Sequence, residues 1–196
     1  MWNDRYSEPG FAYGADPNDF LVEEAAHLPP QAQILCLAEG EGRNGVFLAT
    51  QGHQVTGVDG SAVGLAKAQA LARAKGVEIH TEVADLGAYD LGVNKWDAIV
   101  SIWCHLPQPL RARVHAAAVS ALKPGGVLLL EAYTPRQLAY GTGGPQVVAM
   151  LMEPADLMQE LDGLVIERCE ERVREIHEGR YHEGPSAVVQ LRARRP

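Results

Sequence analysis

The chain has 196 residues and a formal net charge of −8 at neutral pH, from 17 Lys and Arg against 25 Asp and Glu. Hydrophobic residues make up 46% and charged residues 21%, which is close to the soluble globular average and excludes disordered, collagen-like and disulfide-framed chains. The length fits one domain, so we expect residues 1–196 to form a single domain with no room for a second catalytic one. The acidic balance disfavours a nucleic-acid partner, because binding a phosphate backbone needs a basic face.

The three cysteines, Cys36, Cys104 and Cys169, are odd in number and lie far apart in apolar stretches. Such cysteines are typical of buried thiols in a reducing compartment rather than of a disulfide framework. The first residues lack the charged and then apolar run of a secretion signal, and no window approaches the roughly 18 apolar residues of a membrane span. We therefore expect a cytoplasmic protein without membrane contact, as a monomer or a homodimer. The seven histidines form no tight ligand cluster, so no metal site is expected.

Strands and helices are predicted to alternate along most of the chain. A first helix is expected after Asp16-Pro17, which offers an N-cap followed by proline, and it ends at Pro29-Pro30. Short apolar runs predict buried strands, and apolar residues at helical spacing predict the helices between them. The expected strands are 34–38, 53–58, 77–83, 96–102 and 127–130, and the expected helices are 43–51, 62–75, 110–122 and 154–161. The segment 123–126 is expected to be the turn before the fifth strand.

The last stretch of the chain changes character. Residues 165–176 and 181–193 flank the turn sequence at 177–180 and predict an antiparallel hairpin that closes one edge of the sheet. The βαβ units before it predict parallel strands. We therefore expect an α/β protein with a Rossmann-like, doubly wound sheet of seven strands, mostly parallel, with an antiparallel C-terminal hairpin strand.

A glycine-rich loop lies directly between the first strand and the following helix. Gly40, Gly42 and Gly45 spell GxGxxG, and Asp59 ends the next strand 19 residues after Gly40. Glycines there let the backbone approach a ligand, the N–H groups of the helix attract an anionic group, and the carboxylate can accept hydrogen bonds from ribose hydroxyls. The loop therefore predicts a nucleoside-containing ligand. The alternative is a glycine-rich turn that only allows close helix packing.

Two nucleoside cofactors compete at this point, NAD(P) and S-adenosylmethionine. A short-chain dehydrogenase would have a Tyr followed four residues later by Lys, and none of the six tyrosines is followed in this way. A larger dehydrogenase would need a separate substrate domain, for which the chain is too short. The methyl donor is therefore favoured, with an NAD(P)-binding oxidoreductase as the alternative.

Several segments carry a resemblance to one family. They are Trp2, Arg5 and Tyr6, Tyr13-Gly14 with 17–21, the loop 37–44, Val58-Asp59-Gly60-Ser61, Ala84-Asp85-Leu86, the sequence Leu122-Lys123-Pro124-Gly125-Gly126, and the closing hairpin. With these segments, nearly the whole chain resembles the class I S-adenosylmethionine-dependent methyltransferases. It is most similar to the small bacterial group related to tellurite-resistance and thiopurine methyltransferases.

The resemblance implies S-adenosylmethionine as the cofactor and a set of residues that bind it. The glycine loop would hold the methionine part, Asp59 both ribose hydroxyls, and Asp85 with the Leu86 N–H the adenine. Residues 1–30 would cover this site. The full set of expected cofactor-binding residues is Leu37, Ala38, Glu39, Gly40, Gly42, Arg43, Asn44, Asp59, Gly60, Ser61, Asp85, Leu86 and Ser101.

Two positions depart from the family pattern. Cys36 stands where the first strand usually carries an acidic residue, and Ala38 replaces the first glycine. Both changes affect the usual contact to the ammonium group of the cofactor. Glu39 is a candidate to replace the missing acid, and an exposed loop position is the alternative.

The methyl acceptor is expected to be a small molecule, because the family that the chain resembles methylates sulfur and heavier chalcogens. A thiol, a selenol or a tellurite-type species is the first expectation. His105, which follows the fourth strand where the acceptor would lie, is the expected general base, and His182 in the last hairpin is the second candidate. A binding module that lost the transfer step is the alternative that Cys36 and Ala38 leave open.

Overall fold

Seven strands form one sheet in the computed structural model, which describes residues 1–196. They are β1 (Gln33–Leu37), β2 (Gln54–Asp59), β3 (His80–Val83), β4 (Trp96–Ile102), β5 (Leu122–Tyr133), β6 (Val165–Glu178) and β7 (His182–Arg194). Their order is β3-β2-β1-β4-β5-β7-β6, with β1 to β5 parallel and β7 antiparallel to both of its neighbours. This is the Rossmann-like seven-stranded fold that the sequence predicts.

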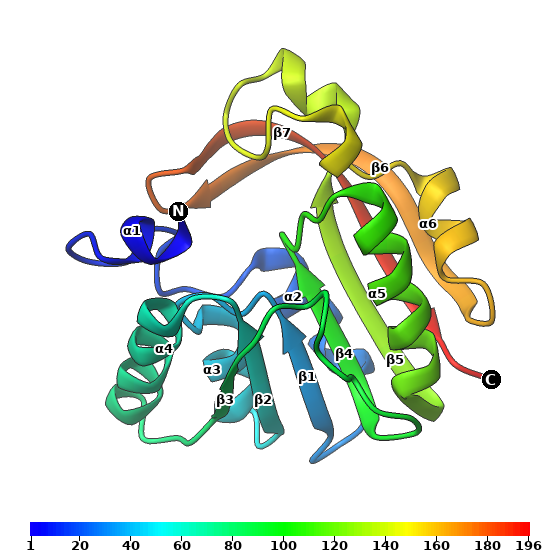
Figure 1. The fold of residues 1–196 in the computed structure, drawn as a ribbon, viewed down its shortest axis with the longest axis horizontal. Helices are drawn as coiled ribbons and strands as arrows, with labels where there is room; N and C mark the ends of the chain where they lie inside the picture. Colours follow the sequence, from blue (N-terminus) through cyan, green and yellow to red (C-terminus); the bar gives the residue numbers. More distant parts are fainter.

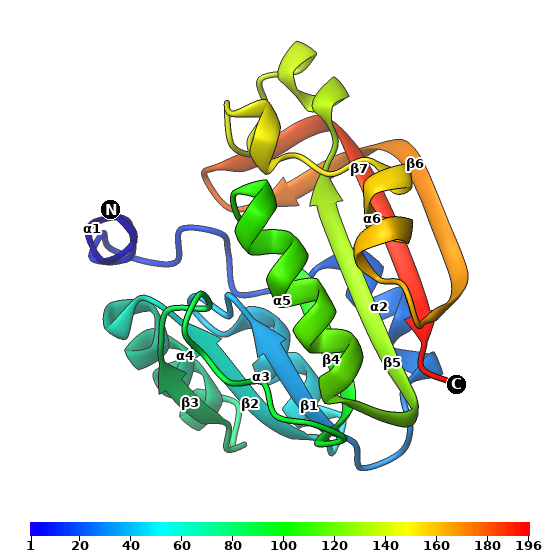
Figure 2. The same ribbon diagram turned by 45° about the vertical axis from the view of Figure 1, so that its right-hand side comes forward.

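Helices cover both faces of the sheet (Figures 1 and 2). They are α1 (Trp2–Tyr6), α2 (Asp19–Glu24), α3 (Arg43–Thr50), α4 (Ala62–Ala74), α5 (Gln108–Ala121) and α6 (Pro154–Glu160), with 3₁₀ turns at 25–27, 135–139 and 148–150. Helices α5 and α6 pack on one face, and α2 and α3 pack on the other. No helix combines the length and apolar character that crossing a bilayer requires.

Strands such as β1 are apolar along most of their length because helices pack on both faces of the sheet. Leu35 and Leu37 of β1 belong to the core layer under α5, whereas Ile34 and Cys36 belong to the layer under α2 and α3. Successive side chains of a strand point to opposite faces, so a strand covered on both faces must be apolar throughout. The chain runs outward from β1 to β3 and then returns to β4, which leaves a switch point between β1 and β4 where open α/β sheets bind ligands.

The structure corrects three details of the expected elements. The helix expected directly after Asp16-Pro17 is α2, and its N-cap is Asn18 instead of Asp16. The Asn18 side chain accepts the Leu21 N–H. The segment 123–126, expected as a turn, is the start of β5. Of the three cysteines, Cys36 and Cys104 are buried as expected, but Cys169 is only half-buried.

Candidate active site

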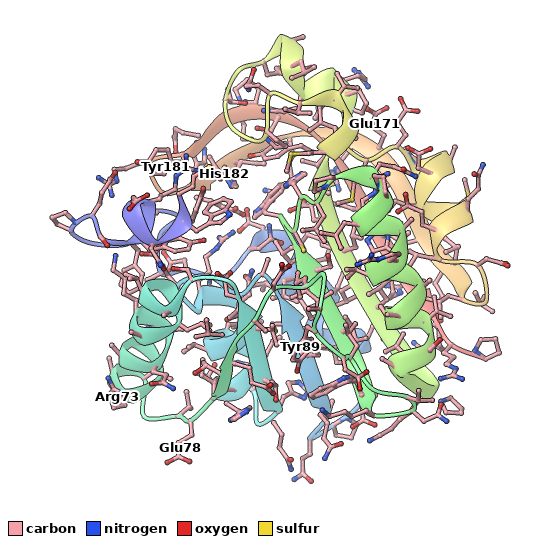
Figure 3. The ribbon with its side chains drawn as sticks, in the orientation of Figure 1. Arg73, Glu78, Tyr89, Glu171, Tyr181 and His182 are labelled. Atoms are coloured by element: carbon pink, nitrogen blue, oxygen red, sulfur yellow. The ribbon has the colours of Figure 1, made fainter.

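A cavity of about 1040 Å³ opens at the carboxyl ends of β1, β2 and β4. The loops after these strands and after β3 form one side of it. Residues 1–14, the loop 141–145 and the tip of the β6–β7 hairpin supply the rest of its lining. Figure 3 shows Tyr181 and His182 at the hairpin tip beside α1, above the ends of the parallel strands.

Most of the expected site residues lie on this cavity. Ten of them line it: Ala38, Glu39, Gly40, Arg43, Asn44, Asp59, Gly60, Asp85, Leu86 and His105. Leu37, Gly42, Ser61 and Ser101 do not. Of residues 1–30, only the first 14 contribute to the lining, because α2 packs on the sheet face with α3 instead.

The backbone after β1 turns sharply toward the cavity. Ala38 and Gly40 have φ angles of 51° and 60°, in the left-handed region that favours glycine. A Cβ on Gly40 would lie 2.8 Å from the hydroxyl of Tyr6, so the cover of the site already closes on this residue. Ala38 keeps the turn of the usual glycine at the cost of some backbone strain.

The four residues that do not line the cavity have structural roles. A Cβ on Gly42 would lie 2.5 Å from the Ala68 Cβ, so this glycine lets α3 and α4 approach and does not make room for a ligand. Ser61 caps α4 by accepting the Gly64 N–H, and it donates to Asn3. Leu37 and Ser101 are buried within their strands.

Two acidic side chains mark the expected nucleoside end of the cavity. Asp59 is almost fully buried, and its two oxygens accept the N–H groups of Gly40 and Ser61 at 2.9 and 2.7 Å. Burial raises the pKa of its carboxyl group above the usual value. Asp85 is exposed, and only its Oδ1 is engaged, by the Gly87 N–H at 2.8 Å. Each oxygen of Asp59 keeps a free lone pair for a further donor.

Glu39 turns its carboxyl group away from the cavity and into the protein. Its Oε1 accepts the Gly45 N–H at 2.8 Å, and its carboxyl group contacts the Cys36 thiol. A Cβ on Gly45 or on Gly57 would come within 2.7 Å of the Glu39 side chain, so these glycines make the room for it. Burial raises the pKa of Glu39 to about 7. Glu39 thus brings a carboxyl group beside Cys36. Its Oε1 holds the glycine-rich loop in place through the Gly45 N–H and does not point into the cavity.

Arg43 and Asn44 line the cavity, yet their polar groups bind protein partners. Arg43 pairs with Glu178 at 2.6 Å, and Asn44 accepts the Asn18 N–H at 3.0 Å. Glu178 also accepts from the Asn18 amide and the Trp103 indole, at 2.8 and 2.7 Å. Hydrogen bonds and the positive charge of Arg43 outweigh the effect of burial and lower the pKa of Glu178, so it stays ionised.

His105 does not have the geometry of the expected general base. Its Nε2 accepts the Tyr133 N–H at 3.0 Å, and its Nδ1 lies 3.2 Å from the Trp103 carbonyl oxygen, to which it donates. Both ring nitrogens are therefore occupied by backbone groups. Burial lowers the pKa of His105 to about 3, so the ring stays neutral and is a weak base. The structure thus gives His105 a role in holding the end of β4 to β5.

The ring nitrogens of His182 are less engaged in hydrogen bonds than those of His105. It lines the cavity at the hairpin tip, and its Nδ1 is enclosed, 3.7 Å from the nearest carboxylate oxygen of Glu178. Three rings surround it, with centroid distances of 4.6 Å to Tyr13, 5.1 Å to Trp103 and 5.2 Å to Tyr133. Burial lowers the pKa of His182 below its ordinary value, so the imidazole is neutral at pH 7.

Residues 1–14 form an N-terminal cover that is tied to the glycine loop and to the hairpin. Lys67 of α4 donates to Glu41 and to the Glu8 and Gly10 carbonyl oxygens. Glu41 in turn accepts the Ala12 N–H at 2.7 Å. On the other side, Glu8 pairs with Arg180 at 2.9 Å.

Residues 34–126 match the family model of the methyltransferase domain. This range runs from β1 into β5 and includes the loops after β1, β2, β3 and β4 that line the cavity. The fold of the chain is that of the class I S-adenosylmethionine-dependent methyltransferases, which confirms the predicted fold, and the match over residues 34–126 supports the predicted family. The NAD(P)-dependent alternative is left without support.

Similar solved structures share the fold at low sequence identity. TehB from Haemophilus influenzae is 18% identical, with a TM-score of 0.76 over 100% of this chain and 66% of TehB. A protein that converts a disulfide bond into a thioacetal group during echinomycin biosynthesis is 20% identical, with a TM-score of 0.78 over 98% and 87%. Magnesium protoporphyrin IX methyltransferase from Synechocystis PCC 6803, with bound cofactor, is 19% identical, with a TM-score of 0.63 over 90% and 75%. No curated protein sequence matches this chain.

Proposed function

We propose that this methyltransferase transfers a methyl group to the chalcogen atom of a small molecule, namely a thiol, a selenol or a tellurite-type species. The observation that carries the proposal is His182, which lines the cavity among aromatic rings and has the Glu178 carboxylate 3.7 Å from its Nδ1. A neutral imidazole that faces the cavity and is backed by an ionised carboxylate can take a proton from an acceptor that is protonated at neutral pH.

The cavity also fits the cofactor. The carboxylate of Asp59 has free lone pairs for ribose hydroxyls, and the Ala38–Gly40 turn leaves the backbone open to a close approach. Asp85 and Leu86 lie on the same cavity and would bind the adenine. S-adenosylmethionine supplies a methyl group on a sulfonium. The protein's part is to hold the acceptor in line with that methyl group and to exclude water.

The aromatic residues around His182 suit a soft nucleophile. Trp103 lines the cavity and stacks on the buried Tyr133 with ring centroids 4.4 Å apart, and the His182 ring lies at a steep angle to both rings. Polarisable sulfur makes favourable contacts with aromatic rings, worth about 0.3–1.5 kcal/mol each. When a thiol sulfur takes the methyl group from the sulfonium, the thiol proton would go to Nε2 of His182. One of the similar structures, the thioacetal-forming protein, also acts on sulfur.

Replacing His182 tests the proposal. With a thiol acceptor, His182→Ala should lower kcat by on the order of 10²-fold, because a free thiol has a pKa near 8.5 and is mostly protonated at pH 7. The wild-type rate should fall as the pH drops through the lowered pKa of His182, and the variant should lack this limb. A selenol, which ionises well below pH 7, should be affected much less.

The matched control is His177→Ala in the same hairpin. His177 is exposed and bonded to Glu183 at 2.7 Å, so its loss should leave kcat unchanged. Equal rates for wild type and His182→Ala with a thiol across pH 6 to 9 would remove the general base from the proposal. Cofactor binding without transfer to any acceptor would instead favour the binding-module alternative.

A further inference from the structure

Arg5 is an arginine on the cavity without a carboxylate partner. Two other arginines line the cavity, and both are paired, Arg43 with Glu178 at 2.6 Å and Arg180 with Glu8 at 2.9 Å. Arg5 forms no ion pair, and its one side-chain hydrogen bond goes to the hydroxyl group of a tyrosine. A half-buried cation on a binding cavity therefore lacks its counter-charge.

The side chain of Arg5 is nevertheless held in place. Its Nη1 donates to the hydroxyl of Tyr13 at 2.7 Å. Its guanidinium carbon lies 4.5 Å from the ring centroid of Tyr181 and 5.2 Å from that of Trp2. Only one of the five N–H donors of the guanidinium is used by these contacts. The position is fixed while most of the hydrogen-bonding capacity stays free.

Arg5 lies between the two ends of the proposed site. The next residue, Tyr6, places its hydroxyl over Gly40 of the glycine loop. Its hydrogen-bond partner Tyr13 has its ring 4.6 Å from that of His182. A group bound by Arg5 would thus lie close both to the loop that holds the cofactor and to the wall that holds the acceptor.

We infer that Arg5 binds a carboxylate group of a ligand in this cavity. A planar guanidinium with free donors matches a carboxylate in a two-pronged hydrogen bond, and the aromatic rings on its faces leave its edges for that contact. Two ligands can supply the carboxylate: the amino-acid end of the cofactor, or an acidic group on the methyl acceptor. The inference rests on the methyltransferase activity and not on the chalcogen proposal.

The first arm of the test measures cofactor binding by calorimetry. S-adenosylhomocysteine carries the carboxylate, and 5′-methylthioadenosine is the same nucleoside thioether without the amino-acid end. Arg5→Gln should weaken binding of S-adenosylhomocysteine by about 10- to 100-fold, the range for a hydrogen bond to a charged group, and leave 5′-methylthioadenosine nearly unchanged. A variant that merely loosens the N-terminal cover would weaken both ligands alike.

The second arm measures binding of mercaptoacetate and of the neutral 2-mercaptoethanol to the protein saturated with S-adenosylhomocysteine. If the acceptor supplies the carboxylate, the wild type should prefer mercaptoacetate and Arg5→Gln should lose that preference. Arg5→Lys, which keeps the charge without the planar fork, should fall between the two in whichever arm responds. Unaltered discrimination by Arg5→Gln in both arms overturns the inference. Failure of the chalcogen proposal would appear separately, in methyl-transfer assays.

Discussion

The most unusual single residue of the site is Glu39, a carboxyl group enclosed below the cofactor loop. It meets the Cys36 thiol and the Gly45 N–H, and the charged groups that face it are Asp59 from β2 and Arg43 from α3. Gly45 and Gly57 are needed because larger residues would overlap with the Glu39 side chain. The carboxyl group beside Cys36 is therefore supplied from a different position of the chain, and two glycines make room for it.

This burial predicts a pH-dependent stability. The pKa of Glu39 rises from an ordinary 4.5 to about 7 in the folded protein, so between these values the unfolded chain is ionised while the folded chain keeps its proton. The free energy of unfolding should therefore fall as the pH rises from 4.5 to 7, by up to about 3 kcal/mol from this residue. Below pH 4.5 the contribution is fully present.

Urea unfolding of wild type and Glu39→Gln at pH 5, 6, 7 and 8 measures the effect. The amide keeps an acceptor for the Gly45 N–H and cannot ionise, so the variant should gain stability relative to wild type as the pH rises. The difference between the two proteins removes the contributions of all other titrating groups. A difference that stays constant over this range would show that Glu39 is ionised in the folded state.

The sequence predicts where a residue such as His105 lies better than it predicts what that residue does. His105 was correctly expected beside the cavity, because ligands bind beyond the carboxyl ends of the strands. The lone pair of His105 Nε2 is occupied by the N–H of Tyr133, which lies 28 positions away in the sequence. No local sequence pattern indicates that bond. Glu178 was missed for the same reason, since its partners Arg43 and Asn18 lie 135 and 160 positions away.

At the scale of elements, strands enclosed by two packed layers were the most predictable. The expected strand 96–102 coincides with β4, a short and mostly apolar run that follows the polar residues Asn94 and Lys95. Helix α1 was not predicted, since five residues are too few to show a period. The N-terminal cover was expected from its aromatic residues, but its attachment through Lys67 and Glu41 joins segments far apart in sequence.

Lys67 should control how often the N-terminal cover opens. It donates to Glu41 and to two carbonyl oxygens of the cover, so Lys67→Met removes three hydrogen bonds at once. We expect the Ala12 amide, which is bonded to Glu41, to exchange its hydrogen at least about 10-fold faster, while the amides of β4 change much less. Hydrogen exchange followed by mass spectrometry measures both.

Lys75→Met is the control for this change, because Lys75 is an exposed lysine at the end of the same helix. It should leave exchange in the cover as in wild type. Saturating S-adenosylhomocysteine should slow exchange of the cover in wild type, since a ligand held beneath the cover stabilises the closed form. Equal acceleration along the whole chain would mean that Lys67 supports the entire fold and not the cover.

At the scale of the whole molecule, the long β6–β7 hairpin completes the proposed site. The parallel strands bring the loops of the cofactor side to one edge of the sheet, and the tip of the β6–β7 hairpin reaches that same edge (Figure 1). Glu178 and His182 pair with each other at this tip. The sequence predicts both parts, the βαβ units and the hairpin. It does not show how far the hairpin tip reaches, because the reach depends on the antiparallel register between β5 and β7. The single-domain organisation and the monomeric or homodimeric state stay predictions.

The central claim is methyl transfer to a chalcogen atom, and a competition assay tests it most directly. The wild-type protein is incubated with S-adenosylmethionine and an equimolar mixture of 2-mercaptoethanol, mercaptoacetate, ethanolamine and glycine, and the methylated products are identified by mass spectrometry. Our account predicts methyl groups on sulfur and a loss of that product with His182→Ala but not with His177→Ala. Methylation of nitrogen or oxygen with no product on sulfur would contradict it.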